Sequence, residues 1–309
     1  MNHNNPCKKI TAQQLKRWMD QGMDFVLVHT LPGEHYKQQH LPGAKNACVY
    51  DVVFPNQMEA MAVDRGQTIV LYGSSSSSRD AVTAAEKLTR LGYRNLHVLT
   101  GGLKAWRDAG YRLEGEAPEE AETRPAALRP AEGRYAVDVE ASFIGWTGRN
   151  INIGHQGMLR LRAGEIAVRD GIITGMFVID MHAIVNFSVE DEALRKILID
   201  HLKSDDFFFV ERFPEARFTM IEARPIQDAV PGIANFEVEG KLTLRGMEGA
   251  ITFPAVVENL ADGGIAAEAH FDLDRTRWGV IYGSGRYFEH LGMHLVYDPI
   301  TIQVRIVAR

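Results

Sequence analysis

The sequence has few cysteines, no long apolar run and no surplus of basic residues. Cys7 and Cys48 are the only cysteines among 309 residues, too few for a disulfide framework. Apolar runs such as 25–28 and 69–72 are far shorter than the roughly 20 residues that a membrane-spanning helix needs. The 34 Lys and Arg residues are outnumbered by 40 Asp and Glu and form no basic stripe, so nucleic-acid binding is not expected.

What the sequence does contain is typical of a soluble protein with two domains. Hydrophobic residues make up 45% and charged residues 24% of the chain, and its length exceeds that of one domain of about 150 residues. The segment 116–132 spaces three prolines among acidic residues and alanines, a composition that stays extended and solvated. We therefore predict domains at 1–115 and 133–309, joined by this linker. Residues 1–6 lack the apolar stretch of a signal peptide, so a cytoplasmic location is expected.

Short apolar runs alternate with helical patterns in the first domain. The runs 25–28, 69–72 and 96–99 are apolar without polar alternation, as expected of buried parallel strands. Helical spacing of apolar residues follows over about 79–91 and again over 103–109. This order predicts an α/β domain, with a parallel sheet and flanking helices.

Several motifs in this domain occur in the order and spacing of one family. They are His40-Leu41-Pro42-Gly43-Ala44 with Asn46, the strand, loop and helix around Arg79, and Gly101-Gly102-Leu103-Lys104-Ala105-Trp106 ending at Gly110-Tyr111. Together they resemble a rhodanese domain over residues 10 to about 115. In sulfurtransferases of that family, the resemblance implies, a cysteine directly after the strand carries a persulfide, and its loop closes on an arginine like Arg79.

The loop that would carry this cysteine contains no thiol. It consists of Gly73, Ser74, Ser75, Ser76, Ser77, Ser78 and Arg79. A serine hydroxyl forms no anion near neutral pH, whereas a cysteine in this setting would be a thiolate. The family's Asp-x-Arg after the first strand is also replaced, by His29-Thr30-Leu31. We therefore expect the first domain to be catalytically inactive and the protein not to be an enzyme.

Two interpretations of this loop stay open. Free backbone N–H groups at the start of the helix, with Arg79 and the hydroxyls, would bind a phosphate, sulfate or carboxylate. The alternative, to which we give more weight, is a serine-rich loop on a relic fold that only contacts a partner or the second domain. A phosphatase is not expected, because Gly73 cannot act as a nucleophile.

The second domain shows the period-two alternation of β-strands. The clearest patterns cover 236–244 and 300–306, and noisier ones cover 143–151, 165–168, 172–180, 216–223, 250–257 and 265–273. One helical pattern, over about 190–202, interrupts them. A single helix cannot cover the apolar face of about eight antiparallel strands, so we predict an all-β, lipocalin-like, eight-stranded barrel with one helix. Such an interior either is filled by side chains or holds one slender ligand.

Further motifs sharpen this prediction. They are 201–208 (HLKSDDFF), 210–214 (VERFP), 216–218 (ARF), 242–246 (LTLRG), 274–279 (DRTRWG) and 282–285 (YGSG). In this order they resemble the YceI family of lipid-binding barrels over residues 133–309. The resemblance implies that a polyisoprenoid or fatty-acyl chain is held in the barrel, and hence that the protein is a carrier or sensor of an apolar molecule.

Side chains at candidate inward and mouth positions are the predicted ligand contacts. They are Trp146, His155, Phe177, Met181, Phe208, Phe218, Trp278, Tyr282 and Phe288. Ordinary core packing is the alternative for the apolar ones, and a surface turn is the alternative for His155. His290 and His294 have the i, i+4 spacing of metal ligands but lack a third partner, so neither a metal site nor a cofactor is expected.

Two rival functions remain open at this stage. One is a sulfurtransferase-related or anion-binding enzyme whose barrel presents a hydrophobic substrate. The other is a stress-response scaffold whose barrel is filled by its own side chains. The sequence also leaves open whether the chain forms a homodimer.

Overall fold

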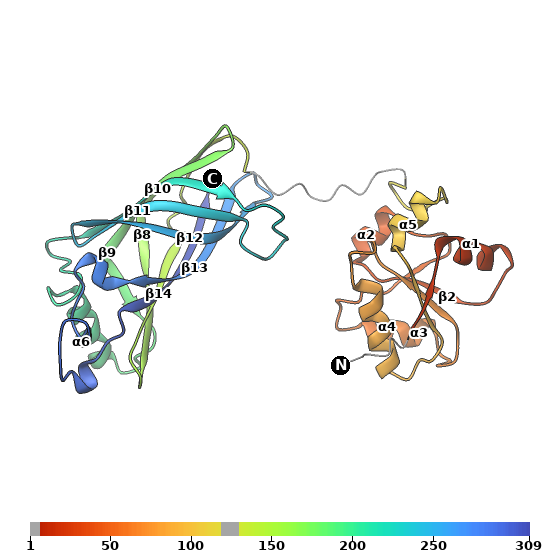
Figure 1. Cartoon of the computed structure of the whole chain (residues 1–309), viewed down its shortest axis with the longest axis horizontal. Helices are drawn as coiled ribbons and strands as arrows, with labels where there is room; N and C mark the ends of the chain where they lie inside the picture. Colours follow the sequence, from red (N-terminus) through yellow and green to blue (C-terminus); the bar gives the residue numbers. More distant parts are fainter. Residues whose placement is uncertain (1–6, 119–129) are drawn as a thin grey trace. The chain divides into compact units, whose positions relative to one another are not determined.

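The computed structural model describes residues 7–118 and 130–309, which belong to two compact units (Figure 1). The predicted linker, 116–132, falls mostly on residues 119–129, outside the described residues. Each unit is considered by itself below. No helix within the described ranges is long and apolar enough to cross a membrane.

The first unit is a parallel sheet of five strands between helices. Its strands are β1 (Lys8–Ile10), β2 (Val26–His29), β3 (Lys45–Asn46), β4 (Ile69–Tyr72) and β5 (Leu96–Leu99), in the order β1-β5-β4-β2-β3. Its helices are α1 (Ala12–Asp20), α2 (Gly33–Gln38), α3 (Phe54–Met61), α4 (Asp80–Arg90) and α5 (Gly102–Asp108). The predicted α/β architecture is confirmed.

Helices cover both faces of this sheet, which explains why its central strands lack polar alternation. Every residue of β2, β4 and β5 is buried. In β4, Ile69 and Leu71 pack in one core cluster with residues of α3 and α4. Val70 and Tyr72 pack in a second cluster with residues of α1 and α5. Successive side chains thus enter two different cores, and both must be apolar.

The second unit is a closed antiparallel barrel. Its strands are β6 (Gly133–Ala136), β7 (Phe143–Arg149), β8 (Gly154–Arg169), β9 (Ile172–Asn186), β10 (Glu215–Pro225), β11 (Phe236–Leu244), β12 (Met247–Asn259), β13 (Ile265–Asp274) and β14 (Pro299–Ala308). They follow the order β6-β8-β7-β14-β13-β12-β11-β10-β9, and β9 pairs again with β8. The first part of β8 pairs with β7 and its last part with β6, so β6 adds to the same edge of β8 as β7. The ring therefore has eight strands, as predicted.

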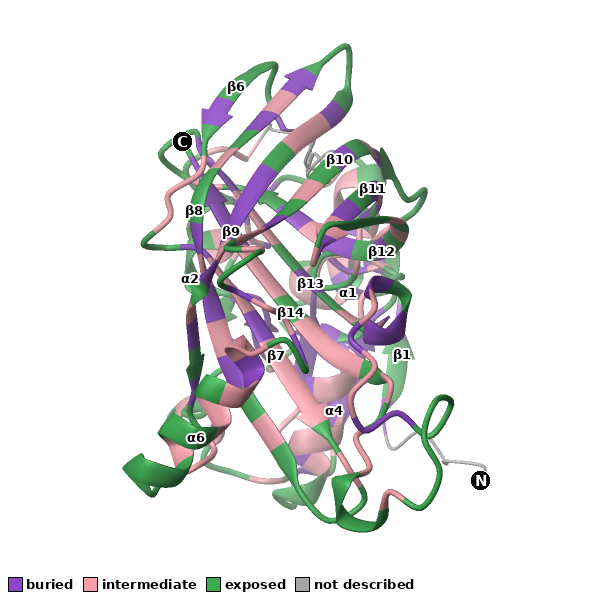
Figure 2. Ribbon diagram, turned by 90° about the vertical axis from the view of Figure 1, so that its left-hand side faces the viewer, coloured by how far each residue is buried: buried purple, intermediate pink, exposed green. Residues whose placement is uncertain are grey.

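Alternation along the strands separates the barrel's interior from its exterior. In β11 the residues Phe236, Val238, Leu242 and Leu244 are buried, whereas Glu237 and its period-two neighbours face outward. Figure 2 shows the resulting stripes of buried and exposed residues along the long strands. This alternation is why the strands could be predicted from a period of two.

A helix and an irregular segment complete one end of the barrel. Helix α6 (Glu192–Lys203) is capped by Asp191, whose side chain accepts from the Leu194 N–H at 2.8 Å. It buries Leu202 against the barrel. The irregular segment runs between β13 and β14 and contains the short 3-10 helices Arg275–Trp278 and Gly292–His294.

Arg275 ties this irregular segment together. Its side chain is 2% exposed, and burial lowers the pKa of the guanidinium. The guanidinium donates hydrogen bonds to the carbonyl oxygens of Tyr297 (3.1 Å), Val280 (2.6 Å) and Val296 (3.0 Å). One side chain thus satisfies carbonyl groups from both ends of the segment.

We predict that Arg275→Met destabilises the barrel. The substitution leaves these carbonyl oxygens without donors in a buried place, and we expect the free energy of unfolding to fall by about 3 kcal/mol. Urea denaturation measures this loss. The matched control is Arg277→Met, which removes an exposed arginine with one backbone hydrogen bond, to the Ala250 carbonyl at 2.6 Å. Equal losses in the two variants would contradict the role given to Arg275.

The carboxyl end of the parallel sheet in the first unit buries His29. Its ring lies 5.1 Å from that of Tyr72 and 5.6 Å from that of His35, measured between centroids. Within the described part of the chain its Nε2 has no hydrogen-bond partner. Burial, with a smaller effect of His35 and His40, lowers the pKa of His29 to about 3. The folded domain therefore holds a neutral imidazole.

We predict that His29 makes the first unit less stable in mild acid. An unfolded chain protonates this histidine at about pH 6.5, whereas the folded domain does so at about pH 3. The contribution of the neutral His29 to the free energy of unfolding is complete above about pH 6.5. It is lost, by about 1.4 kcal/mol per pH unit, as the pH falls from there toward about pH 3. Hydrogen–deuterium exchange of residues 7–118 measures the effect. In His29→Phe, the stability of the first unit should depend less steeply on pH, and exchange in the barrel serves as the internal control. Equal slopes of stability against pH in the variant and the unmodified protein would refute the prediction.

Candidate functional site

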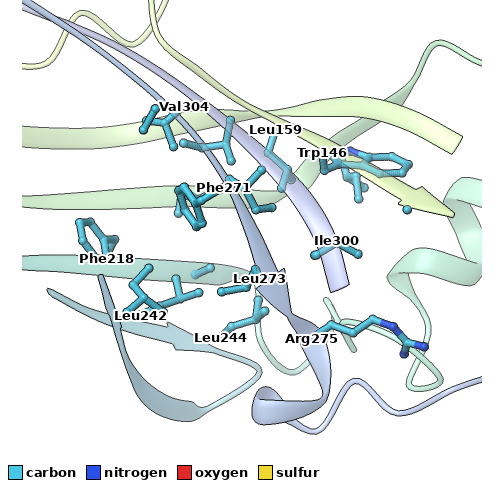
Figure 3. A pocket seen from close by; sticks show the side chains of 18 of the residues that line it. Trp146, Leu159, Phe218, Leu242, Leu244, Phe271, Leu273, Arg275, Ile300 and Val304 are labelled. Atoms are coloured by element: carbon cyan, nitrogen blue, oxygen red, sulfur yellow. The ribbon is translucent and has the colours of Figure 1, made fainter. Parts of the chain in front are cut away.

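The barrel contains a long apolar cavity of about 410 Å³ (Figure 3). All eight strands of the ring, β7 to β14, contribute lining side chains, and most of these are aliphatic or aromatic. In Figure 3, Trp146, Ile300 and Arg275 lie toward one end of the view and Phe218 and Val304 toward the other. A void of this size and polarity is suited to a molecule that is itself apolar.

The cavity is open at one end. Ile153, in the turn between β7 and β8, and Met293, before β14, both line it and are 53% and 85% exposed. The turn and the segment before β14 are neighbours, since the Tyr297 N–H donates to the Arg149 carbonyl at 2.9 Å. Leu198 of α6 lines the cavity as well. These residues form the mouth.

The opposite end is closed by side chains. Ile166, Ile173 and Ile265 are among the lining residues there, and each is buried. Tyr135 and Phe236 pack in the same cluster but do not line the cavity. The cavity is thus a blind tunnel with one entrance.

Polar side chains gather around the mouth. Arg149, Asn150, His155, His201 and His294 all line the cavity there. His201 Nε2 lies 3.0 Å from a carboxylate oxygen of Asp206, and His155 Nδ1 lies 3.3 Å from the Ser188 hydroxyl. Burial lowers the pKa of His155. The mouth therefore offers hydrogen-bonding groups where the apolar tunnel meets solvent.

Most of the side chains predicted to contact a ligand line the cavity, and two do not. Those on the lining are Trp146, His155, Phe177, Met181, Phe208, Phe218 and Tyr282. Trp278 is completely buried, and its Nε1 donates to the Leu242 carbonyl at 2.9 Å. Phe288 is partly exposed in the irregular segment, away from the lining. A role in ligand binding remains a prediction for all of them.

Sequence reasoning missed the lining residues at the mouth. Ile153 and Met293 lie in a turn and a short 3-10 helix, where no period marks which side chain faces inward. Leu198 had a usable signal, because it belongs to the apolar stripe of α6. That stripe does not reveal which of its members reaches past the core into the tunnel.

The loop from Gly73 to Arg79 lies at the carboxyl end of β4. The carbonyl oxygens of Gly73 and Ser74 accept from the N–H groups of Leu103 and Lys104, at 2.9 Å each, which fixes the loop on the first turn of α5. Arg79 is largely exposed, and its Nη2 lies 3.5 Å from a Glu86 carboxylate oxygen.

A carboxylate from the helix fills the space beside Gly73. A Cβ atom at that position would lie 2.6 Å from the Asp80 Oδ2 atom. Asp80 is buried and accepts hydrogen bonds from the hydroxyls of Ser78 and Tyr50. The hydrogen bond to Asp80 raises the pKa of Tyr50 to about 12. A negative charge beside the loop opposes binding of a phosphate, sulfate or carboxylate, the first of the two interpretations of the serine-rich sequence.

Neither of the two cysteines, Cys7 and Cys48, belongs to the loop 73–79, and both are buried. Across residues 7–118 and 130–309, no group of three or more His, Cys, Asp or Glu side chains is placed to hold a metal ion. The two candidate sites are therefore the blind tunnel and the loop beside Asp80.

Comparisons with solved structures find proteins that are similar to part of this chain. Burkholderia cenocepacia BcnA is 19% identical with a TM-score of 0.44, covering 56% of this chain and 99% of that one. A polyisoprenoid binding domain from Saccharophagus degradans is 16% identical with a TM-score of 0.40, covering 57% and 97%. A rhodanese-like domain from an Anabaena protein is 22% identical with a TM-score of 0.33, covering 38% and 86%. No curated protein matches the chain.

Two family models match the chain. Residues 11–109 match the rhodanese-like domain, and residues 135–308 match the YceI-like domain. The second match covers more than half of the sequence. The protein therefore belongs to the YceI-like family and carries a rhodanese-like domain ahead of its YceI-like domain.

Proposed function

We propose that the protein binds a long apolar molecule, an isoprenoid or fatty-acyl chain, in its barrel and acts as a carrier or sensor of that molecule. The observation that carries this proposal is the blind apolar tunnel with a single polar-rimmed mouth. Membership of the YceI-like family, with which such chains are associated, supports it.

The tunnel gives a physical reason for binding. Protein interiors are ordinarily packed without voids much larger than water, so about 410 Å³ of apolar space is a large departure. A ligand chain that enters removes its own surface from water, which is worth about 0.8 kcal/mol for each buried methylene group. It also restores the dispersion contacts that the lining side chains lack in the empty state. A barrel filled by its own side chains, the scaffold alternative, would not leave this space.

The mouth would determine which head group is accepted. An apolar chain threaded into the tunnel leaves its polar end near Arg149, His155 and His201. The hydrogen-bonding groups of these residues are partly engaged by neighbours such as Asp206 and Ser188. We therefore expect a head group that accepts or exchanges a few hydrogen bonds, with most of the affinity coming from the chain.

We predict that purified protein carries an apolar ligand or takes one up. Solvent extraction and native mass spectrometry detect the ligand, and a fluorescent fatty-acid probe measures uptake by delipidated protein. Met293→Asp should weaken probe binding about tenfold, because a carboxylate at the mouth opposes entry of the chain. Val63→Asp is the matched control, since Val63 is equally exposed, at 85%, but belongs to the first unit. Protein that contains no lipid and takes up no probe would overturn the proposed function.

We further infer that the rhodanese-like domain does not transfer sulfur. A persulfide needs a thiolate at the loop, and positions 73 to 79 provide none. The Asp80 carboxylate occupies space beside Gly73 and would repel an anionic sulfur donor such as thiosulfate. The domain then serves a binding or structural purpose.

We predict no thiosulfate-to-cyanide turnover by the unmodified chain. Ser74→Cys alone should stay nearly inactive, because the carboxylate of Asp80, which lies beside the preceding residue Gly73, disfavours both a thiolate and an incoming anion. Combining Ser74→Cys with Asp80→Ser should raise turnover at least about tenfold over the single variant. Asp80→Ser by itself is the control and should show none. Turnover by the unmodified chain would instead favour the rival sulfurtransferase function.

A further inference from the structure

A band of phenylalanine rings crosses the wall of the tunnel. The band consists of Phe177 on β9, Phe218 on β10, Phe253 on β12 and Phe271 on β13. Successive ring centroids are 6.2, 5.7 and 4.3 Å apart. Strand β11 passes between β10 and β12 with Gly240, where a Cβ atom would lie 2.5 Å from the Phe218 ring. The glycine therefore makes room for the band.

The band divides the lining into two parts. The cluster on the mouth side contains Leu202, Leu244 and Leu273, and the cluster on the closed side contains Ile173, Val257 and Ile265. Phe218 and Phe271 pack against both clusters, which places the band at their boundary. The tunnel is continuous across it, because one cavity is lined by residues of both clusters.

The part beyond the band, which we call the inner chamber, has four alanines among its lining side chains. Ala223, Ala255, Ala267 and Ala269 all line it. Ala255 and Ala269 are paired across β12 and β13, and each is only 4% exposed. Their methyl groups leave the axis of the barrel empty at this depth. Ile265 and its neighbours then close the chamber.

We propose that the inner chamber measures the length of the ligand's apolar chain. This inference rests on the proposed function. The polar end stays at the mouth, the chain passes the phenylalanine band, and its terminal carbons fill the space between the alanines. A chain that just reaches the closed end buries every carbon. A longer chain must leave some carbons in water outside the mouth, or draw its head group into the apolar tunnel. The geometry selects one flexible chain of limited length, since an eight-stranded barrel has room for only a slender ligand.

Filling or enlarging the chamber should shift the preferred length in opposite directions. Ala269→Leu adds three carbon atoms to the lining, so the longest chain that fits should shorten by about three methylene groups. Because each buried methylene changes affinity about fourfold, that chain should bind about 50-fold more weakly, while short chains bind unchanged. Ile265→Ala removes three carbon atoms at the closed end and should admit chains longer than the unmodified protein accepts.

The test is a homologous series of saturated fatty acids, bound to the delipidated full-length chain and measured by calorimetry. Ala266→Leu is the matched control, because Ala266 neighbours the lining residues on β13 but does not line the tunnel. Circular dichroism reports folding, and Ala255→Val replaces Ala269→Leu if the latter does not fold. Opposite shifts in preferred chain length for the filling and enlarging variants support the proposal that the inner chamber measures chain length.

Two negative results have different meanings in this experiment. If the purified protein contains no lipid and the unmodified chain binds no member of the series, the proposed lipid binding fails, and the proposed length selection fails with it. If the unmodified chain binds the fatty acids and all variants keep the same dependence of affinity on chain length, lipid binding stands. Only the proposed length selection by the inner chamber is then overturned.

Discussion

The pairing of β8 with β9 is the interaction on which the barrel depends. It closes the ring, so that every strand of the eight has two neighbours and the apolar faces all turn toward one axis. Closure fixes the interior diameter by the number of strands, whatever side chains are available to fill it. Where the inward positions carry alanine, the barrel wall is complete but the side chains are too short to reach the barrel axis. A cavity then follows from the backbone geometry rather than from a packing defect.

Glycines on the strands shape that interior as much as the large residues do. Trp146 lies over Gly157 on the adjacent strand β8, where a Cβ atom would come within 2.8 Å of the indole ring. Gly240 plays the same part for Phe218. An aromatic ring can lie flat against a barrel wall only where a neighbouring strand offers no side chain. The tunnel's shape is therefore encoded by aromatic and glycine positions on neighbouring strands.

Regular periodicity explains what the sequence could predict and where prediction ended. Apolar and polar residues alternate along the sequences of β11 and of 300–306 in β14, and the buried runs of β2, β4 and β5 lie between two helical layers. The antiparallel barrel and the parallel sheet could therefore be predicted from the pattern of the sequence. Trp278 follows the end of β13 in a 3-10 turn, and its hydrogen bond to Leu242, distant in sequence, directs it into the core. The missing thiol was visible in the sequence. The placement of Asp80 beside Gly73 was not, because it depends on how the loop folds back.

The core of the rhodanese-like domain does not depend on the side chains of its loop 73–79. Its stability comes from strands buried on both faces and from two core clusters, and residues 74 to 79 belong to neither cluster. The identity of the side chains there therefore leaves the core contacts unchanged, and the fold by itself does not specify what chemistry the loop performs. Asp80, by contrast, is buried and hydrogen-bonded to Tyr50 and Ser78, and so ties the loop to the segment that follows β3. The same carboxylate fills the space beside Gly73, so the packing of this loop and the room it leaves for a ligand are set by one side chain.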